Sequence, residues 1–155
     1  MGHCIQVIVG SKYVLDSLQQ RLGSSKVVEL CHGLFLLPVT EEFYEALPSA
    51  SDTLTWSGGF NFRFLDAKLV RLLIDASQID TVAYVETEYF GGDGGEGAIV
   101  ARGGKIVFGP AEGEGSINAA LQLLGAKKEG GRDEFDSIEL GRFRSNEDWI
   151  EQPRY

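Results

Sequence analysis

Apolar residues recur at helical spacing in several stretches of the chain. The clearest is "FLDAKLVRLLIDASQ", residues 64–78, where Leu65, Leu69, Leu72 and Leu73 form one apolar stripe and charged residues face elsewhere. An amphipathic helix of this kind packs its apolar stripe on a flat surface such as a sheet. Further helices are predicted after residues that cap helix starts, namely Ser11, Thr40, Ser116 and Ser145, with ends near Leu22, Pro48, Gly125 and Ile150.

Stretches rich in β-branched and aromatic residues predict strands. "TVAYVETEYF" at 81–90 is followed by "GAIVA" and "KIVFG", which Gly103-Gly104 joins in a tight two-residue turn, so three strands form a meander. Three earlier segments complete the predicted sheet: a strand at 4–9 and a hairpin made of 26–30 and 33–39. Residues 48–61 read as a long loop, and 133–150 as an extended segment followed by a short helix. The prediction is one α+β domain, residues 1–155, with a mostly antiparallel sheet, a β-meander in its C-terminal half and flanking helices.

Composition restricts the possible settings and partners. With 155 residues, of which 43% are hydrophobic, the chain can bury a core without cross-links. No apolar stretch is long enough to span a bilayer and the first ten residues lack a secretion signal, so a soluble cytoplasmic protein without a membrane partner is expected. The net charge of −9 repels phosphate backbones and attracts basic proteins. We therefore predict no binding of nucleic acid.

Catalytic machinery is sparse in this sequence. Cys4 and Cys31 each lie in an apolar run, and both are expected to be buried, reduced thiols. Cys31 and His32 are adjacent, and neighbours on a strand point in opposite directions, so a Cys/His nucleophile pair is not expected. We predict no catalytic residues, no metal and no cofactor.

The glycine-rich stretch "GGDGGEG" at 91–97 raises the question of a ligand loop. A Walker-type phosphate loop needs Lys followed by Ser or Thr after its last glycine, but Glu96-Gly97-Ala98 stands there. Asp93 and Glu96 are oxygen donors suited to calcium, although their spacing does not match an EF-hand. The favoured interpretation is a hairpin rim in which glycines supply positive φ angles and the acids point to water.

The strand before this loop has an acidic and aromatic face. Period two places Tyr84, Glu86 and Glu88 on one side of it. An exposed outer face is the simpler interpretation. If a helix covers the face instead, each glutamate needs a partner. The candidate partners are Arg63, Arg71 and Arg102.

The second half of the chain resembles a known group of bacterial proteins. The segments "VETEYFGGDGGEGAIVARGGKIVFGP", "INAALQLLG" and "DEFDSIELGRFRSNEDW" together resemble small immunity proteins of polymorphic toxin systems of the contact-dependent inhibition or Rhs type, over residues 81–149. The sequence departs from that pattern at Asp93 and Glu96, where the group more often has smaller or apolar residues. The resemblance implies a cytoplasmic protein that binds a cognate toxin domain and blocks its access to substrate.

Charge and resemblance together predict a toxin-neutralising immunity protein whose partner is a basic, nuclease-like toxin domain. Its predicted partner-binding surface comprises Tyr84, Glu86, Glu88, Tyr89, Phe90, Asp93, Glu96, Glu112 and Glu114. Two alternatives remain: a small-molecule or metal-binding domain that uses the Glu86/Glu88 face and the glycine-rich loop, and a structural module without a dedicated ligand. The sequence predicts nothing about the oligomeric state.

Overall fold

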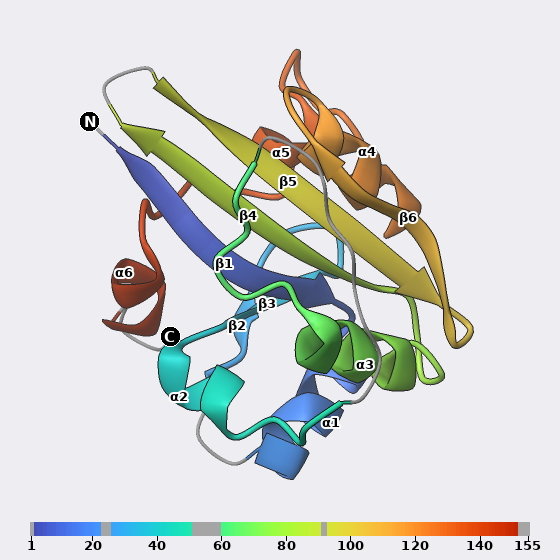
Figure 1. Cartoon of the computed structure of the whole chain (residues 1–155). Coiled ribbons are helices and arrows are strands. Elements are labelled where there is room, and N and C mark those ends of the chain that lie inside the picture. The colour runs from blue at the N-terminus through green and yellow to red at the C-terminus, as the bar shows by residue number, and fades with distance from the viewer. Residues whose placement is uncertain (1, 23–25, 51–59, 91–92, 152–155) are drawn as a thin grey trace.

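Six strands form one antiparallel sheet in the computed structural model of the chain, which describes residues 2–22, 26–50, 60–90 and 93–151 (Figure 1). Their order across the sheet is β2-β3-β1-β4-β5-β6. The strands are β1 His3–Gly10, β2 Val28–Glu29, β3 Phe35–Pro38, β4 Val82–Phe90, β5 Asp93–Arg102 and β6 Lys105–Glu112. Every strand pair is antiparallel, and β4-β5-β6 is the predicted meander. The predicted α+β class is confirmed.

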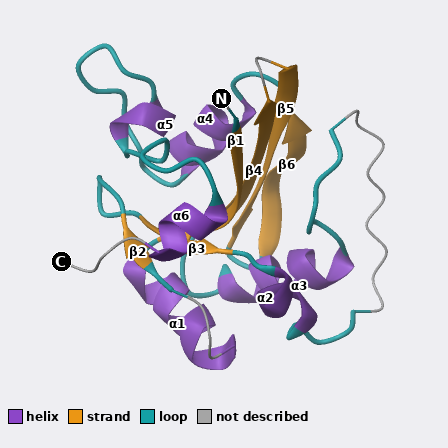
Figure 2. Ribbon diagram, turned by 90° about the vertical axis from the view of Figure 1, so that its left-hand side faces the viewer, coloured by secondary structure: helices purple, strands orange, loops and turns teal. Residues whose placement is uncertain are grey.

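Helices cover both faces of the sheet. The described residues form α1 Lys12–Leu22, α2 Glu41–Glu45, α3 Ala67–Ala76, α4 Ser116–Leu123, α5 Glu134–Ser137 and α6 Asn146–Glu151. The first three helices pack on one face, and residues of α4 and α6, together with Ile138 just after α5, pack on the other. Figure 2 shows α4 and α5 to the left of strands β4, β5 and β6. None of the described helices has the length and apolar character needed to cross a membrane.

Alternate side chains of β4 belong to two separate apolar clusters, one on each face of the sheet. Val82 and Tyr84 belong to the cluster beneath α1, α2 and α3, whereas Ala83 and Val85 belong to the cluster beneath α4. The strand is buried from Val82 to Thr87 and becomes exposed only afterwards. The expectation of an exposed outer face was therefore wrong for most of the strand, because elements on both sides cover it.

Polar side chains cap the starts of α2 and α3, at Thr40 as predicted and at Asp66, which the sequence pattern had placed inside its helix. The carboxylate of Asp66 accepts hydrogen bonds from the backbone N–H groups of Lys68 and Leu69, at 2.9 and 3.2 Å, and α3 starts directly after it. Thr40 caps α2 through the N–H of Phe43. The predicted apolar stripe of α3 is buried at Leu69, Leu72 and Leu73.

The C-terminal segment differs from its prediction in one part. Residues 134–137 form α5, where an extended segment was expected, because Asp133 accepts a hydrogen bond from the N–H of Asp136 and starts a helical turn. The predicted short helix is present as α6. Just before and within it, the chain pairs with β1: the N–H of Cys4 donates to the carbonyl of Arg144, and the buried Asn146 amide bonds the backbone of Gln6.

The glycine-rich stretch also differs from its prediction. β5 begins at Asp93, so residues 93–97 belong to a strand and pair with β4 as far as Phe90. Gly91 and Gly92, the remainder of the expected rim, lie outside the described residues. Most of the long loop expected at 48–61 also lies outside them.

Candidate functional site

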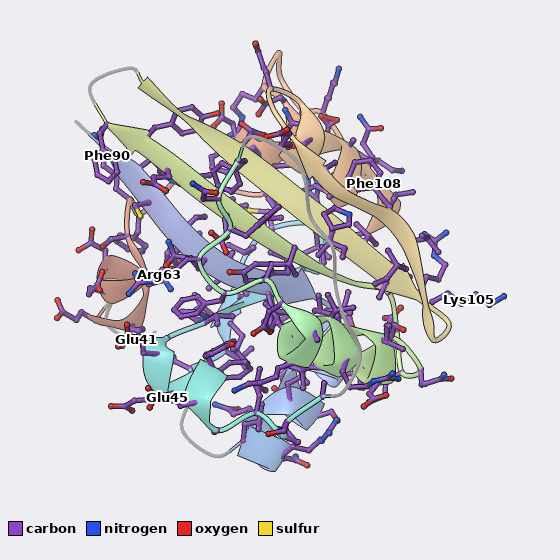
Figure 3. The ribbon with its side chains drawn as sticks, in the orientation of Figure 1. Glu41, Glu45, Arg63, Phe90, Lys105 and Phe108 are labelled. Carbon is purple, nitrogen blue, oxygen red and sulfur yellow. The ribbon has the colours of Figure 1, made fainter. Side chains whose placement is uncertain are left out.

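A cleft of about 480 Å³ opens at the end of the sheet where β4 and β5 meet. Its lining residues are Phe60, Asn61, Glu88, Phe90, Gly94, Gly95, Glu96, Glu112 and Gly113. Figure 3 shows Phe90 at this end of the sheet and Lys105 at the opposite end. None of the described residues that line the cleft is basic, so its character is acidic, aromatic and glycine-rich.

The strand registers place most of this lining on the face that α3 covers further along. Glu88 is opposite Gly95, and Glu112 of β6 is opposite Gly97. Since side chains on β4 alternate, Phe90 shares this face with Glu88. The cleft thus begins where the helical cover of the sheet ends.

One wall of the cleft is an extended segment that crosses the same face, residues 60–64, which we name the strap (Figure 1). The carboxylate of Glu86 fixes its far end. It accepts hydrogen bonds from the N–H of Arg63, at 2.7 and 2.9 Å to its two oxygens, and from the N–H of Phe64 at 3.1 Å. The hydroxyl of Tyr84 donates to the same carboxylate. Glu86 is thus a buried acceptor that holds a loop on a sheet.

Burial has the largest effect on the pKa of the Glu86 carboxyl. Its side chain is 2% exposed. Desolvation raises the pKa of this carboxyl above its usual range, while the hydrogen bonds from Arg63, Tyr84 and Phe64 act in the opposite direction with a smaller effect. The Arg63 guanidinium lies outside, 3.5 Å from Glu41 (Figure 3). The partnership predicted between Glu86 and Arg63 therefore exists, but through the backbone N–H.

Glycines on β5 provide the space that the strap occupies. A Cβ at Gly97 would lie 2.4 Å from Cζ of Phe62, and one at Gly95 would lie 3.0 Å from Cδ1 of Phe60. The Phe60 and Phe62 rings therefore rest on bare backbone, in edge-to-face contact with each other at 5.0 Å. At the cleft end, the N–H of Phe60 donates to Glu112 at 2.5 Å.

Glu96 contributes its carboxylate to the opposite side of the sheet. One oxygen accepts from the N–H of Ile117, in the first turn of α4, at 3.2 Å, and the other accepts from the Tyr89 hydroxyl at 2.9 Å. Gly115 precedes α4 without a side-chain cap, so Glu96 supplies the missing acceptor from a neighbouring strand. Burial and the adjacent Glu96 raise the pKa of Tyr89 to about 12.

The predicted binding residues therefore separate into three groups. Tyr84 is 0% exposed and Glu86 is 2% exposed, so their placement on a partner-binding surface was wrong: the strap and α3 cover them. Tyr89 and Glu96 are half-buried and bond each other. Glu88, Phe90 and Glu112 are exposed at the cleft, and Glu114 is exposed just beyond it. The backbone of Asp93 pairs with Phe90 between β5 and β4. The side chain of Asp93 lies outside what the structure describes.

The cysteine and histidine side chains have separate partners. The Cys31 thiol donates to Glu139 at 3.0 Å, whereas Nε2 of His32 lies 2.9 Å from Glu129. The hydrogen bond to Glu139 raises the pKa of Cys31, which favours the protonated thiol. Nδ1 of His3 lies 2.6 Å from the Thr87 hydroxyl. Both thiols are free and half-buried, so the expectation of full burial was wrong.

Sequence reasoning missed two parts of the site: the strap, and the glycines on which it rests, Gly95 and Gly97. The alternation of phenylalanines at 60, 62 and 64 indicates an extended segment with one apolar side, and this pattern was available in the sequence. Within the described part of the chain, no three His, Cys, Asp or Glu side chains are grouped so as to hold a metal ion.

Comparisons with known proteins add no relatives to this description. No family model matches the chain, and neither a curated protein nor a solved structure matches it.

Proposed function

We propose that this protein is an immunity-type binding protein, which neutralises a basic toxin domain in the cytoplasm through the acidic and aromatic end of its sheet. The observation that supports this proposal best is the cleft. Glu88 is exposed there beside Phe90, a large apolar side chain that is 59% exposed. Aromatic residues within a charged rim are typical of protein interfaces.

Electrostatics favours a basic partner. The chain carries 23 acidic and 14 basic residues, and its net charge of −9 attracts cationic proteins over long distances. Glu88, Glu112 and Glu114 add a local acidic surface at the end of the sheet. An inhibitor of this kind needs no catalysis, because it acts by covering the partner's own site.

A co-expression rescue tests the proposal. The C-terminal toxin domain encoded by the adjacent upstream gene is induced in bacteria with and without this protein, and survivors are counted. The wild-type protein should restore growth and Glu88→Lys should not. Glu45→Lys is the matched control, since Glu45 is an exposed acid on α2, away from the cleft (Figure 3). Toxicity that the wild-type protein does not relieve would contradict the proposal.

The cleft also supports a second candidate function, the binding of a small molecule. Its volume of about 480 Å³ lies within the range of about 300–1,000 Å³ that is typical of small-molecule sites. Glu86 is closed off by the strap, so a ligand would contact Glu88 and Glu112 instead. A thermal-shift screen of small cationic compounds tests this candidate: a rise in Tm that Glu88→Gln abolishes would support it.

A further inference from the structure

Both aromatic walls of the cleft lie against other parts of the chain. A Cβ on Gly2 would lie 2.9 Å from Cδ1 of Phe90, so this exposed ring leans on the start of the chain instead of projecting freely. The Phe60 ring rests on Gly95 and against Phe62. Rings held in this way lose little conformational entropy when a ligand stacks on them. The cleft can therefore bind a flat or cationic group at a low cost in side-chain entropy.

The three glutamates that line the cleft differ in what they already bind, and Glu96 is engaged by Tyr89 and Ile117. Glu112 accepts the N–H of Phe60, which orients its carboxylate. Glu88 is exposed and has no hydrogen bond or ion pair with any residue that the structure describes. Its cross-strand neighbours are Cys4 and Gly95, neither of which brings a positive charge. Glu88 is thus the carboxylate available to an incoming cation.

We propose that the cleft binds the guanidinium group of an arginine side chain on the partner protein, an inference that rests on the proposed function. A guanidinium stacks on aromatic faces and donates paired hydrogen bonds to a carboxylate. The cleft offers both features, through the exposed Phe90 ring and through Glu88, with the largely buried Phe60 as its inner wall. An ammonium group lacks the planar shape, and an anion is repelled by the acids.

The surface of this protein already contains such an arrangement. The Arg63 guanidinium lies over the Phe64 ring, 5.0 Å from its centre, and 3.5 Å from the carboxylate of Glu41. This is the combination of ring, guanidinium and glutamate that the proposal places in the cleft. The difference is that the cleft supplies the ring and the glutamate but no arginine.

A titration with a blocked amino acid tests the chemistry directly. N-acetyl-arginine amide is added to the full-length protein, and the backbone amide shifts of Glu88, Phe90 and Gly95 are followed by NMR. These shifts should saturate together. N-acetyl-citrulline amide is the matched probe, because it keeps the shape and loses the charge, and it should bind at least about tenfold more weakly.

Two variants locate the binding. Glu88→Gln should weaken the arginine probe by about tenfold, as expected for the loss of a charge-assisted contact. Glu45→Gln removes the same charge from α2 and should leave the affinity unchanged. Thermal unfolding of both variants checks that they fold. Both substituted positions are exposed, so folding should be retained. Equal binding of the citrulline probe, or no saturable shift at the cleft, would overturn the inference.

A second measurement separates the inference from the proposed function. Exposed arginines of the toxin domain are changed one at a time to glutamine, and binding is measured to the wild-type protein and to Glu88→Gln. One toxin variant should bind the wild-type protein about tenfold more weakly than the unchanged toxin does, and should show no such loss with Glu88→Gln. The losses do not add, because the toxin change and Glu88→Gln remove the same contact. Rescue of growth with no such coupling would overturn the arginine site alone. Binding of the arginine probe without any rescue would overturn the immunity function alone.

Discussion

Three glutamates near the end of the sheet share a residue type but have different environments. Glu86 is buried and binds the strap, Glu88 lies two residues later in the open cleft, and Glu96 caps α4 on the other face. Along β4, burial ends between the first two positions. The chemistry of each carboxylate is therefore decided by what lies above it and not by its place in the acidic pattern.

Burial of Glu86 predicts a specific pH dependence of stability. Because burial raises its pKa in the folded state, the folded protein holds this proton more tightly than the unfolded chain does. The free energy of unfolding should therefore fall as the pH rises from the ordinary glutamate pKa through the raised one. Glu86→Gln cannot titrate, so the stability of wild type relative to this variant should decrease over that window. Urea denaturation of both proteins between about pH 4 and 8 measures it.

Glu88→Gln is the control for this series, because it removes a nearby exposed carboxylate. The free energy of unfolding of Glu88→Gln should keep the pH-dependent decrease that Glu86→Gln removes. If the stability of wild type relative to Glu86→Gln increased with pH, hydrogen bonding and not burial would control the carboxyl.

At the scale of elements, two segments depend on contacts with β5. The strap rests on Gly95 and Gly97, and α4 begins under the carboxylate of Glu96. Even and odd positions of the same strand thus support different elements on its two faces. This division explains why a run of glycines is placed within a strand, where glycine alone is usually unfavourable.

The packing of the strap predicts an unusual result for a glycine in a strand. Alanine at such a position ordinarily adds about 0.5–1 kcal/mol of stability. At Gly97 the added Cβ would meet the Phe62 ring at 2.4 Å, and overpacking of this kind costs about 1–3 kcal/mol. We therefore expect Gly97→Ala to lower the free energy of unfolding. Chemical denaturation measures the change.

The double variant Gly97→Ala with Phe62→Leu identifies the cause. Leucine lacks the end of the ring, so the alanine should cost less in this background than in wild type. The same cost in both backgrounds would show that the strap is not the source of the conflict.

The start of α4 predicts a smaller effect for Glu96. Glu96→Gln removes the negative charge that faces the first turn of the helix, which should cost about 0.5–1 kcal/mol. The pKa of Tyr89 should fall from about 12, because Glu96 contributes to its increase. Thermal unfolding and ultraviolet titration of tyrosine measure the two effects.

Glu114→Gln provides the comparison for this helix, because it removes the same charge from an exposed position just before α4. Its effect on stability should be smaller than that of Glu96→Gln. Equal losses from both variants would indicate a general charge effect without a cap.

At the scale of the whole molecule, the acidic charge governs how fast a partner arrives. In the proposed function, a net charge of −9 and the acidic end of the sheet would attract a basic partner domain before contact. Contacts in the cleft would then set the dissociation rate of that complex. Charge and cleft thus act on different rate constants.

This separation predicts the salt dependence of binding to the toxin domain. Raising the salt concentration from about 0.05 to about 0.5 M should lower the association rate constant by about tenfold or more and change the dissociation rate constant much less. Surface plasmon resonance measures both constants. A dissociation rate that carried most of the salt effect would contradict long-range attraction as the main contribution of the charge.

The sequence by itself determined the local structure of this protein. Apolar periodicity placed α1 and α3, β-branched and aromatic residues placed the meander, and Thr40 marked the start of α2, because these effects act between residues close in the chain. It also indicated Glu88 and Phe90 as surface residues near the end of β4, where burial ceases.

Only the tertiary structure decided which of the predicted site residues are accessible. The strap reaches Glu86 from 23 positions earlier in the sequence, and α4 reaches Glu96 from 21 positions later. Alternation along a strand defines two faces but does not reveal what covers either of them. Tyr84 and Glu86 were therefore placed on the surface from the sequence, and the cleft between Phe60 and Phe90 became visible only when segments distant in the chain were brought together.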